Sequence, residues 1–369
     1  MTLRLVSRLG SRLGSLLVAL SVPVGCSRGV QVNNAPAASA ASAAGAATTV
    51  APSGTVIVAN MGDHTATLID VASKRVVATL PTGQGAHEVA VSHDGRWAVV
   101  SNYGVRGAPG NSLTVIDVAA AIVSRTIDLG EVRRPHGSAF LPGDSLLAVT
   151  SEASKTVVLI DFRNGTVAGS IPTNHPVSHM LAMTADAKRM FTSNIGDGTV
   201  SELDVPGRKF VREFTVAPQV EGIAVTPGGE QVWVGSNQQK TVTVIDARAG
   251  TTVGTLTGFG MPYRLAITPD GKTVVITDPP NGTVRIVDAV TRRDRSTVKV
   301  DSAGVTAAAE FPGSPSPEGI ALSRDGRMAF VTLQGSARLA LIDIASATVI
   351  GYVPTGPGAD GIGYSPFGR

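Results

Sequence analysis

The chain repeats one short unit seven times, and this repeat constrains its fold more than any other feature. A strand-like run that ends in an aspartate recurs along the sequence, most often as Val-Ile-Asp or Leu-Ile-Asp. Successive repeats are 47, 44, 43, 42, 42 and 55 residues apart, and their aspartates are Asp70, Asp117, Asp161, Asp204, Asp246, Asp288 and Asp343. A period of about 40–45 residues with several strands in each copy is typical of a β-propeller blade.

Each repeat also holds a pair of strands joined by a tight turn. Apolar runs flank Asp94-Gly95, Asp270-Gly271 and Asp325-Gly326. Asp-Gly between such runs predicts a hairpin because glycine accepts the positive φ that the turn requires. A further strand follows each repeated aspartate. Together with the hairpin pair and the strand that ends in the aspartate, it gives each unit four antiparallel strands. The sequence therefore predicts an all-β fold, a seven-bladed propeller over residues 54–369.

The two ends of the repeat region predict how the ring closes. The region begins near Gly54 with the second strand of a blade, and it ends with a stretch that matches a first strand, Asp360-Gly361-Ile362-Gly363-Tyr364-Ser365-Pro366. We therefore expect the C-terminal strand to complete the N-terminal blade, which leaves no open edge at the junction.

Residues 1–25 are typical of a signal peptide. Arg4, Arg8 and Arg12 precede an uncharged apolar run of 13 residues, which is too short to span a membrane. The only cysteine, Cys26, follows at the position that is lipidated in a bacterial lipoprotein, and simple cleavage is the alternative. Residues 26–53 are rich in Ala and Ser, which predicts a flexible tether. We expect an exported protein, either periplasmic or a lipoprotein anchored to the membrane.

The charge and cysteine content exclude several classes of protein. The formal net charge is +3, and removal of the three leader arginines abolishes this excess. No nucleic-acid partner is therefore expected. A single cysteine excludes a disulfide framework and a zinc site built from cysteines.

The residues that begin the inner strands carry the strongest chemical signal. In blade order they are His87, His136, His179, Glu221, Tyr263, Glu318 and Asp360. Equivalent residues of a propeller converge at the mouth of its central channel. Imidazole with carboxylate suits a divalent metal such as zinc, copper or iron. The predicted metal ligands are therefore His87, His136, His179 and Glu221. A polar pocket without metal, and a mouth with no dedicated role, remain open as alternatives.

Other residues at the same mouth are candidates for binding a ligand, which would be anionic if the arginines contact it. They are Asn102, Arg106, Tyr263, Arg264, Glu318 and Asp360. Glu318 and Asp360 are the candidate general bases if the protein is an enzyme. Two long connections, 103–111 and 301–317, are expected on this face, where binding loops gather. A second set of residues lies at the ends of the second strands and is interpreted, like the repeated aspartates, as turn caps. Its members are Asn60, Asn102, Glu152, Asn194, Asn237, Asp278 and Leu333.

The repeats resemble the YVTN-repeat family of β-propellers over residues 54–366. The matching stretches are Val99-Val100-Ser101-Asn102, Thr241-Val242-Thr243-Val244-Ile245-Asp246 and Pro317-Glu318-Gly319-Ile320-Ala321-Leu322-Ser323. The resemblance implies a propeller of an exported bacterial protein. It implies no single function, because the family and its relatives include surface-layer, periplasmic and enzymatic members.

Two functions are consistent with these observations. The first is a binding scaffold of the cell envelope, whose partner is an envelope protein or a small-molecule ligand. The second is a metal-dependent propeller enzyme, a lactonase-type hydrolase or an oxidoreductase, that uses the ring of three histidines and a glutamate.

Overall fold

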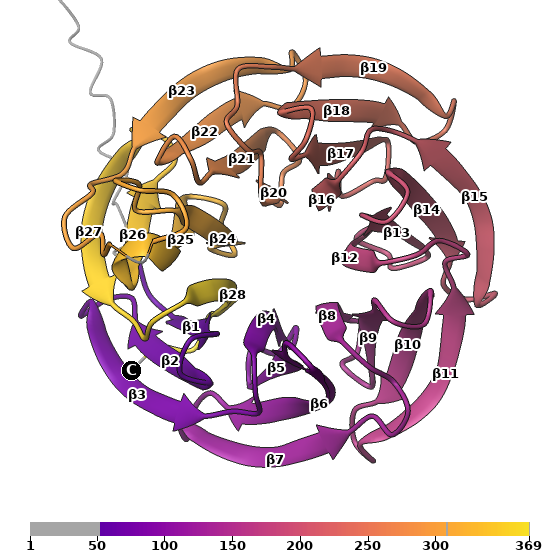
Figure 1. The fold of residues 1–369 in the computed structure, drawn as a ribbon, viewed down its shortest axis with the longest axis horizontal. Helices are drawn as coiled ribbons and strands as arrows, with labels where there is room; N and C mark the ends of the chain where they lie inside the picture. The colour runs from indigo at the N-terminus through magenta and orange to yellow at the C-terminus, as the bar shows by residue number, and fades with distance from the viewer. Residues whose placement is uncertain (1–51, 308, 369) are drawn as a thin grey trace, which may run out of the picture. The chain divides into compact units, whose positions relative to one another are not determined.

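The computed structural model describes residues 52–307 and 309–368. Cys26, the predicted signal peptide and nearly all of the predicted tether lie outside these residues. In the described part, seven sheets of four antiparallel strands surround a common centre (Figure 1). The predicted all-β, seven-bladed propeller is confirmed.

The blades are numbered 1 to 7, and their strands are given from the innermost outwards. Blade 1 has β28 (Ala359–Ser365), β1 (Thr55–Asn60), β2 (Thr65–Asp70) and β3 (Arg75–Pro81), and blade 2 has β4 (Ala86–Val91), β5 (Trp97–Val105), β6 (Ala108–Asp117) and β7 (Ile122–Asp128). Blade 3 has β8 (Pro135–Phe140), β9 (Leu146–Ser151), β10 (Thr156–Asp161) and β11 (Thr166–Pro172), and blade 4 has β12 (Ser178–Met183), β13 (Arg189–Asn194), β14 (Thr199–Asp204) and β15 (Lys209–Thr215). Blade 5 has β16 (Val220–Val225), β17 (Gln231–Ser236), β18 (Thr241–Asp246) and β19 (Thr251–Leu256), and blade 6 has β20 (Leu265–Ile267), β21 (Thr273–Asp278), β22 (Thr283–Asp288) and β23 (Arg293–Lys299). Blade 7 has β24 (Pro317–Leu322), β25 (Met328–Leu333), β26 (Arg338–Asp343) and β27 (Thr348–Pro354).

The C-terminal strand closes the ring as the sequence predicts. β28 is the innermost strand of blade 1, where it pairs with β1 from Thr55↔Ser365 to Asn60↔Ala359. The Thr55 hydroxyl also donates to the carbonyl of Phe367 at 2.7 Å. The two ends of the described chain are therefore hydrogen-bonded within one sheet.

The core consists of apolar layers between neighbouring blades. Between blades 1 and 2, for example, Ile57 and Leu68 pack with Val100 and Ile116, and all four are fully buried. The two middle strands of most blades are buried over nearly their whole length, whereas the outermost strands are exposed or half-buried and have at most one buried residue each. Small β-branched and aliphatic side chains fill these layers, which explains how a chain with 4% aromatic residues builds a core.

The open outer edges of the blades all carry the same irregularity. In every blade the pairing between the third and fourth strands shifts by one residue, as between Leu159 and Ile160 in blade 3. A bulge twists an exposed edge and hinders pairing with another sheet.

The seven repeated aspartates are turn caps, as predicted. Each carboxylate accepts a hydrogen bond from the backbone N–H three residues further on, at 2.7–3.2 Å; the donors are Ser73, Ala120, Asn164, Gly207, Ala249, Thr291 and Ser346. These aspartates therefore hold the turn between the third and fourth strands of each blade and belong to the fold.

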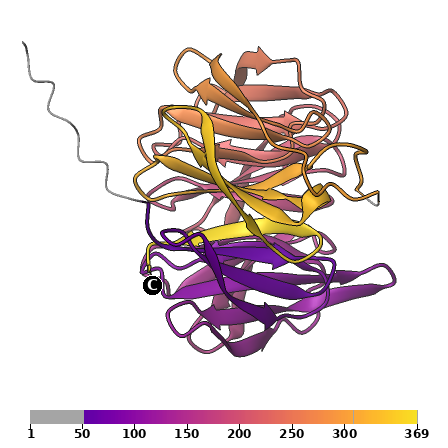
Figure 2. The ribbon, with the colours of Figure 1, turned by 90° about the vertical axis from the view of Figure 1, so that its left-hand side faces the viewer.

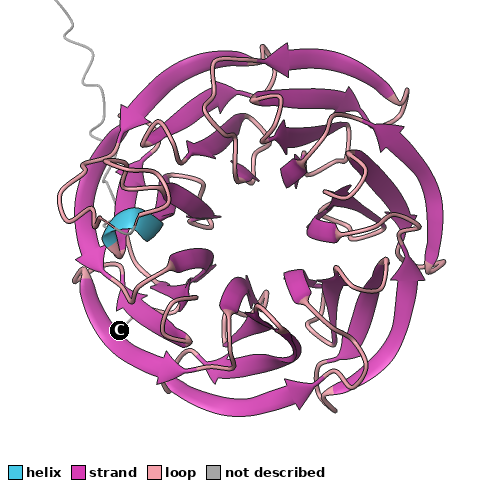
Figure 3. Cartoon of the chain, in the orientation of Figure 1, coloured by secondary structure: helices cyan, strands magenta, loops and turns pink. Residues whose placement is uncertain are grey.

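The described residues contain a single short helix, the 3₁₀ turn η1 (Gln334–Ser336) (Figure 3). Within 52–307 and 309–368, no helix is long and apolar enough to cross a membrane. Figure 2 shows the purple β5–β6 hairpin and the orange connection that precedes β24 reaching out on one face, whereas the C-terminal end lies on the other.

Candidate metal centre

A left-handed turn leads into most of the inner strands and directs the ring residues towards the channel. Two positions before the ring residue, six of the seven blades have a residue with φ between 53° and 67°: Gly85, Arg134, Val177, Gln219, Ser316 and Gly358. For a residue with a side chain this conformation costs about 1–2 kcal/mol. Its recurrence at Arg134, Val177 and Gln219 indicates that the surrounding fold imposes it.

Hydroxyl groups of the preceding blade fix the backbone of the ring residues. In five blades, a Ser or Thr near the end of the second strand donates to the carbonyl of the next ring residue at 2.6–2.8 Å. The pairs are Ser101 with His136, Thr150 with His179, Ser193 with Glu221, Thr277 with Glu318, and Thr332 with Asp360. The side chains of the ring therefore start from a rigid frame.

Glycines let the inner strands approach one another closely. A Cβ atom on Gly361 would lie 1.9 Å from the carbonyl oxygen of His87, and one on Gly222 would lie 2.3 Å from that of Tyr263. Both distances are impossible for a real side chain. A glycine directly after the ring residue is therefore a requirement of the narrow channel at these two positions.

The structure brings the three predicted histidines together. The ring centroids of His87 and His136 are 4.3 Å apart, and those of His136 and His179 are 3.7 Å apart. His136 lies between the other two and is fully buried, whereas His87 keeps partial exposure. The channel mouth is thus lined by three imidazoles from blades 2, 3 and 4.

His179 is held between two carboxylates. Its Nδ1 lies 2.5 Å from Oε1 of Glu152, and its Nε2 lies 2.5 Å from Oε1 of Glu221. Burial alone would lower the pKa of His179, but Glu221 and Glu152 outweigh this and raise the pKa to about 9. Burial would likewise raise the pKa of Glu221, and the cations His179 and Arg264 lower it to about 2. Without a metal, these groups form a buried, charged network.

Arg264 extends this network across the channel. Its guanidinium donates to Oε1 of Glu221 at 2.8 Å and to Oε1 of Glu88 at 2.7 Å. Glu88 belongs to blade 2 and Arg264 precedes β20 in blade 6, so the contact joins strands that are far apart in the ring. The side chain of Arg264 is only 6% exposed. It is therefore engaged with two carboxylates and is not the free cation that the sequence suggested for an anionic ligand.

His136 has no partner in this network. Both of its ring nitrogens are buried and lack any hydrogen-bond partner among the described residues. Burial lowers the pKa of His136 well below its ordinary value, and the neighbouring His179 and His87 lower it further. His136 is therefore a neutral imidazole, the form that coordinates metals.

Three side chains lie close enough to share one metal ion. His136, Glu152 and His179 each offer a ligand atom, and these atoms lie within 4.8 Å of one another. Two of these residues are predicted ligands. The third is Glu152 and not Glu221, because Glu221 contacts the far nitrogen of His179. His87 lies beside this group but outside it.

The register of the second strands explains why Glu152 was interpreted as a turn cap. In blade 2, Asn102 pairs with Ala86, the residue directly before His87. In blade 3, the residue directly before His136 is Pro135, and it pairs with Ser151. Ser151 is therefore the equivalent of Asn102, and Glu152 lies one residue further on. A shift of one residue turns a side chain to the other side of a strand. Glu152 therefore faces the channel, whereas Asn102 accepts from the N–H of Gly83 at 3.0 Å and stabilises the fold.

Other residues in the position of Glu152 form contacts at the channel mouth as well. Tyr103 donates through its hydroxyl to Oε2 of Glu152, Gln334 donates to Glu318 at 2.8 Å, and Asn237 donates to Glu221 at 3.5 Å. All these residues directly follow the last residue through which a second strand pairs with the innermost strand. This position in the repeat is the sequence signal that would have identified them.

The two candidate bases are held by other partners. Glu318 is buried and accepts from Ser316 at 3.0 Å, and burial and the neighbouring Asp360 raise its pKa well above the ordinary value. Oδ2 of Asp360 is in direct contact with Nδ1 of His87. Glu318 and Asp360 are therefore part of the channel lining in blades 7 and 1.

The remaining candidates occupy different surroundings. Tyr263 is half-buried and packs under Arg264, whose guanidinium carbon is 4.3 Å from the ring centroid. Arg106 is exposed at the tip of the β5–β6 hairpin. Arg106 thus extends outwards from the mouth, whereas Tyr263 belongs to the buried network.

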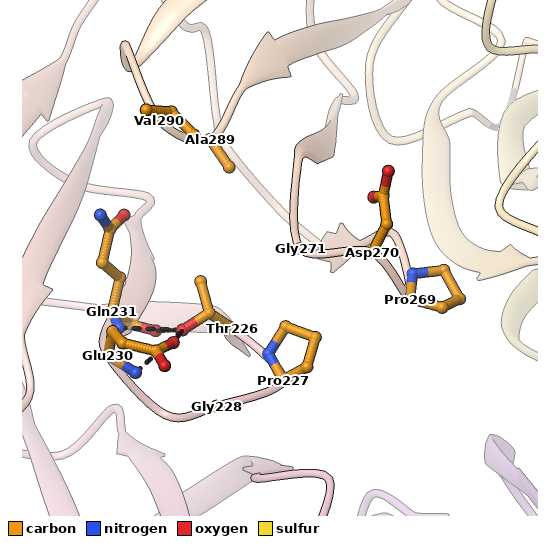
Figure 4. Close-up of a pocket in the computed structure, with 10 residues that line it drawn as sticks. All are labelled: Thr226, Pro227, Gly228, Glu230, Gln231, Pro269, Asp270, Gly271, Ala289 and Val290. Carbon is orange, nitrogen blue, oxygen red and sulfur yellow. Dashed lines mark hydrogen bonds between the residues drawn. The ribbon is translucent and has the colours of Figure 1, made fainter.

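Two cavities lie at the end of the inner strands that is away from the histidine cluster. One of about 400 Å³ is formed by the hairpins that follow β16 and β20, with Thr226, Glu230 and Asp270 in its wall (Figure 4). The other, of about 440 Å³, runs along β4, β8 and β12 and is lined by Val89, Phe140 and Met183. Neither includes a residue of the histidine cluster.

Comparison with known proteins supports the fold and no more. No family model matches the chain, and a search of curated proteins finds no match. Among solved structures 1760 chains match, including one from hydrazine synthase of Kuenenia stuttgartiensis. That match has a TM-score of 0.66 and 18% identity, and it covers 79% of this chain and 92% of the other. At this identity the likeness shows the propeller fold alone.

Proposed function

We propose that the protein is a metal-binding β-propeller that holds one zinc, copper or iron ion at its channel mouth, with His136, His179 and Glu152 as ligands. The observation that carries the proposal is the burial of both unpartnered nitrogens of His136. Buried polar atoms nearly always have a partner, and the exceptions commonly mark a missing water or ion. An imidazole already neutral beside a second imidazole and a carboxylate has the donor set of these metals.

The surrounding network would orient the ligands. With Nδ1 of His179 directed at the metal, Nε2–H would donate to Glu221, which is the carboxylate partner usual for a coordinating histidine. Glu221 is held by Arg264, and Arg264 by Glu88, at 2.8 and 2.7 Å. These three residues would fix the tautomer and direction of His179 without touching the ion.

We favour a binding role over catalysis. Three protein ligands leave one coordination position for an external ligand, as in catalytic zinc sites. However, both candidate bases are engaged with the protein itself, Glu318 with Ser316 and Gln334, and Asp360 with His87. A metal-dependent hydrolase or oxidoreductase therefore remains the second candidate, supported by the open position alone.

The metal content of the purified protein tests this function. Wild-type protein is expected to retain about one ion per chain, and His136→Ala is expected to lose it. His93→Ala is the matched control, because His93 is an exposed histidine that pairs with Asp144 outside the cluster. Equal metal content in wild type and His136→Ala would refute the ligand assignment.

We further propose that this propeller acts in the bacterial cell envelope. The signal-like residues 1–25, the position of Cys26 and the resemblance to YVTN-repeat proteins support export and lipid anchoring. Cys26→Ser is expected to move the protein from the membrane fraction to the soluble fraction. A wild-type protein found only in the soluble fraction would contradict the anchor.

A further inference from the structure

Arg134 is a half-buried cation beside the candidate metal ligands. It precedes His136 by two residues, and its backbone N–H donates to the carbonyl of Gly110 at 2.9 Å, which holds it against the β5–β6 hairpin. Its guanidinium carbon lies 4.8 Å from the ring centroid of Tyr103. Arg134 is thus packed on the tyrosine that contacts Glu152.

Arg134 also has no anionic partner. Arg264 pairs with two carboxylates and the adjacent Arg133 pairs with Glu131, whereas none of the ion pairs among the described residues includes Arg134. Its charge nevertheless acts on the site. Burial and Glu152 raise the pKa of Tyr103 to about 12, and Arg134 offsets part of this rise. A cation beside the metal ligands is therefore available for an external group.

The side of the cluster that carries Arg134 is partly open to solvent. His136 is fully buried, whereas Tyr103, Arg134 and Glu152 are only partly buried. Tyr103 contacts Glu152 through Oε2, and Glu152 also contacts His179 through Oε1. A molecule that reaches the metal from outside would therefore pass Tyr103 and Arg134.

We propose that the channel mouth binds a small oxyanion, with one oxygen on the open position of the metal and another on the guanidinium of Arg134. This inference rests on the proposed metal site. The planar guanidinium presents paired N–H donors that match a carboxylate or a phosphate. The ligand would be the anionic partner that Arg134 lacks.

Cobalt-loaded protein allows the oxyanion and the metal to be measured separately. Cobalt(II) would be titrated first, and acetate or phosphate would then be added while the visible absorption of the metal is recorded. We expect a saturable spectral change with at least one of the two anions. The anion that gives the tighter binding identifies the class as carboxylate or phosphate.

Adjacent arginines provide a matched pair of variants. Arg134→Gln is expected to bind the anion about 10- to 100-fold more weakly, the loss typical of a charge-assisted hydrogen bond. It should take up cobalt with the stoichiometry of wild type, since Arg134 is not a ligand. Arg133→Gln, which removes a neighbouring charge directed at Glu131 and Gly130, should bind cobalt and the anion as wild type does.

The outcomes separate this inference from the proposed function. If the protein takes up no cobalt, the metal site is wrong and the oxyanion site is wrong with it. If cobalt binds but neither anion changes its spectrum, or if Arg134→Gln binds the anion as tightly as Arg133→Gln, only the oxyanion site is refuted. Loss of cobalt in Arg134→Gln would also refute it, because Arg134 would then support the metal ligands.

Discussion

Removal of Arg264 should destabilise the metal-free propeller more than removal of any exposed cation. Arg264 is 6% exposed and bonds to Glu88 and Glu221, whose side chains are each 10% exposed. Arg264→Met would leave the buried carboxylate of Glu88 without its cation and would leave Glu221 with His179 alone. Breaking a buried pair in this way costs about 3–5 kcal/mol. At about 2 °C per kcal/mol for a large domain, the unfolding temperature should fall by about 6–10 °C.

The assay compares unfolding in the presence of a chelator, by circular dichroism and tryptophan fluorescence. Lys209→Met is the control, because Lys209 is 68% exposed and its pair with Asp204 spans 3.5 Å. An exposed pair contributes about 0–1 kcal/mol. Glu88→Gln added to Arg264→Met should restore part of the stability, because a neutral amide replaces an unpaired buried charge. The reasoning is refuted if Arg264→Met is as stable as the control, or if the added Glu88→Gln restores nothing.

Three further predictions concern the close packing of the inner strands, the carboxylate that orients His179, and the dependence of stability on pH. Gly361→Ala should cost about 1–3 kcal/mol or more, because its Cβ would overlap the carbonyl of His87; unchanged denaturant unfolding would contradict this approach of the strands. Glu221→Gln should weaken metal binding about 10- to 100-fold at unchanged stoichiometry in chelator competition, and unchanged affinity would exclude Glu221 as the partner of His179. In metal-free protein, Glu221 stabilises the fold fully above its ordinary pKa of 4.5, and this contribution is lost as the pH falls towards 2. His179 stabilises the fold fully below its ordinary pKa of 6.5, and this contribution is lost as the pH rises through about 9. Unfolding measured against pH should therefore show stability falling above about pH 6.5, and a flat alkaline side would show that His179 is not held as described.

The fold could be predicted from the sequence because its determinants are local and repeated. The Asp-Gly turns, the aspartate caps and the period each report on a few neighbouring residues, and seven copies reinforce one another. The repeat region begins with the second strand of a blade and ends with a first strand, and this pattern also predicted the closure by β28. These features need no knowledge of which side chains meet across the channel.

The composition of the site could be predicted only in part. Counting from the repeat placed His136 and His179 at the channel mouth correctly, since equivalent positions converge. It misplaced Glu152, because Ser151 is the true equivalent of Asn102 and the next residue of a strand faces the other side. The link between Glu88 and Arg264 joins residues 176 apart in the chain, and no local pattern indicates a contact across the ring.

The most direct test is an elemental analysis of wild-type protein and His136→Ala, both purified without added metal or an affinity tag that binds metal. We predict about one zinc, copper or iron ion per wild-type chain, a rise in unfolding temperature when that metal is restored after chelation, and neither in the variant. Wild-type protein that contains none of the three metals, and whose unfolding temperature does not change when they are added, would contradict the metal site.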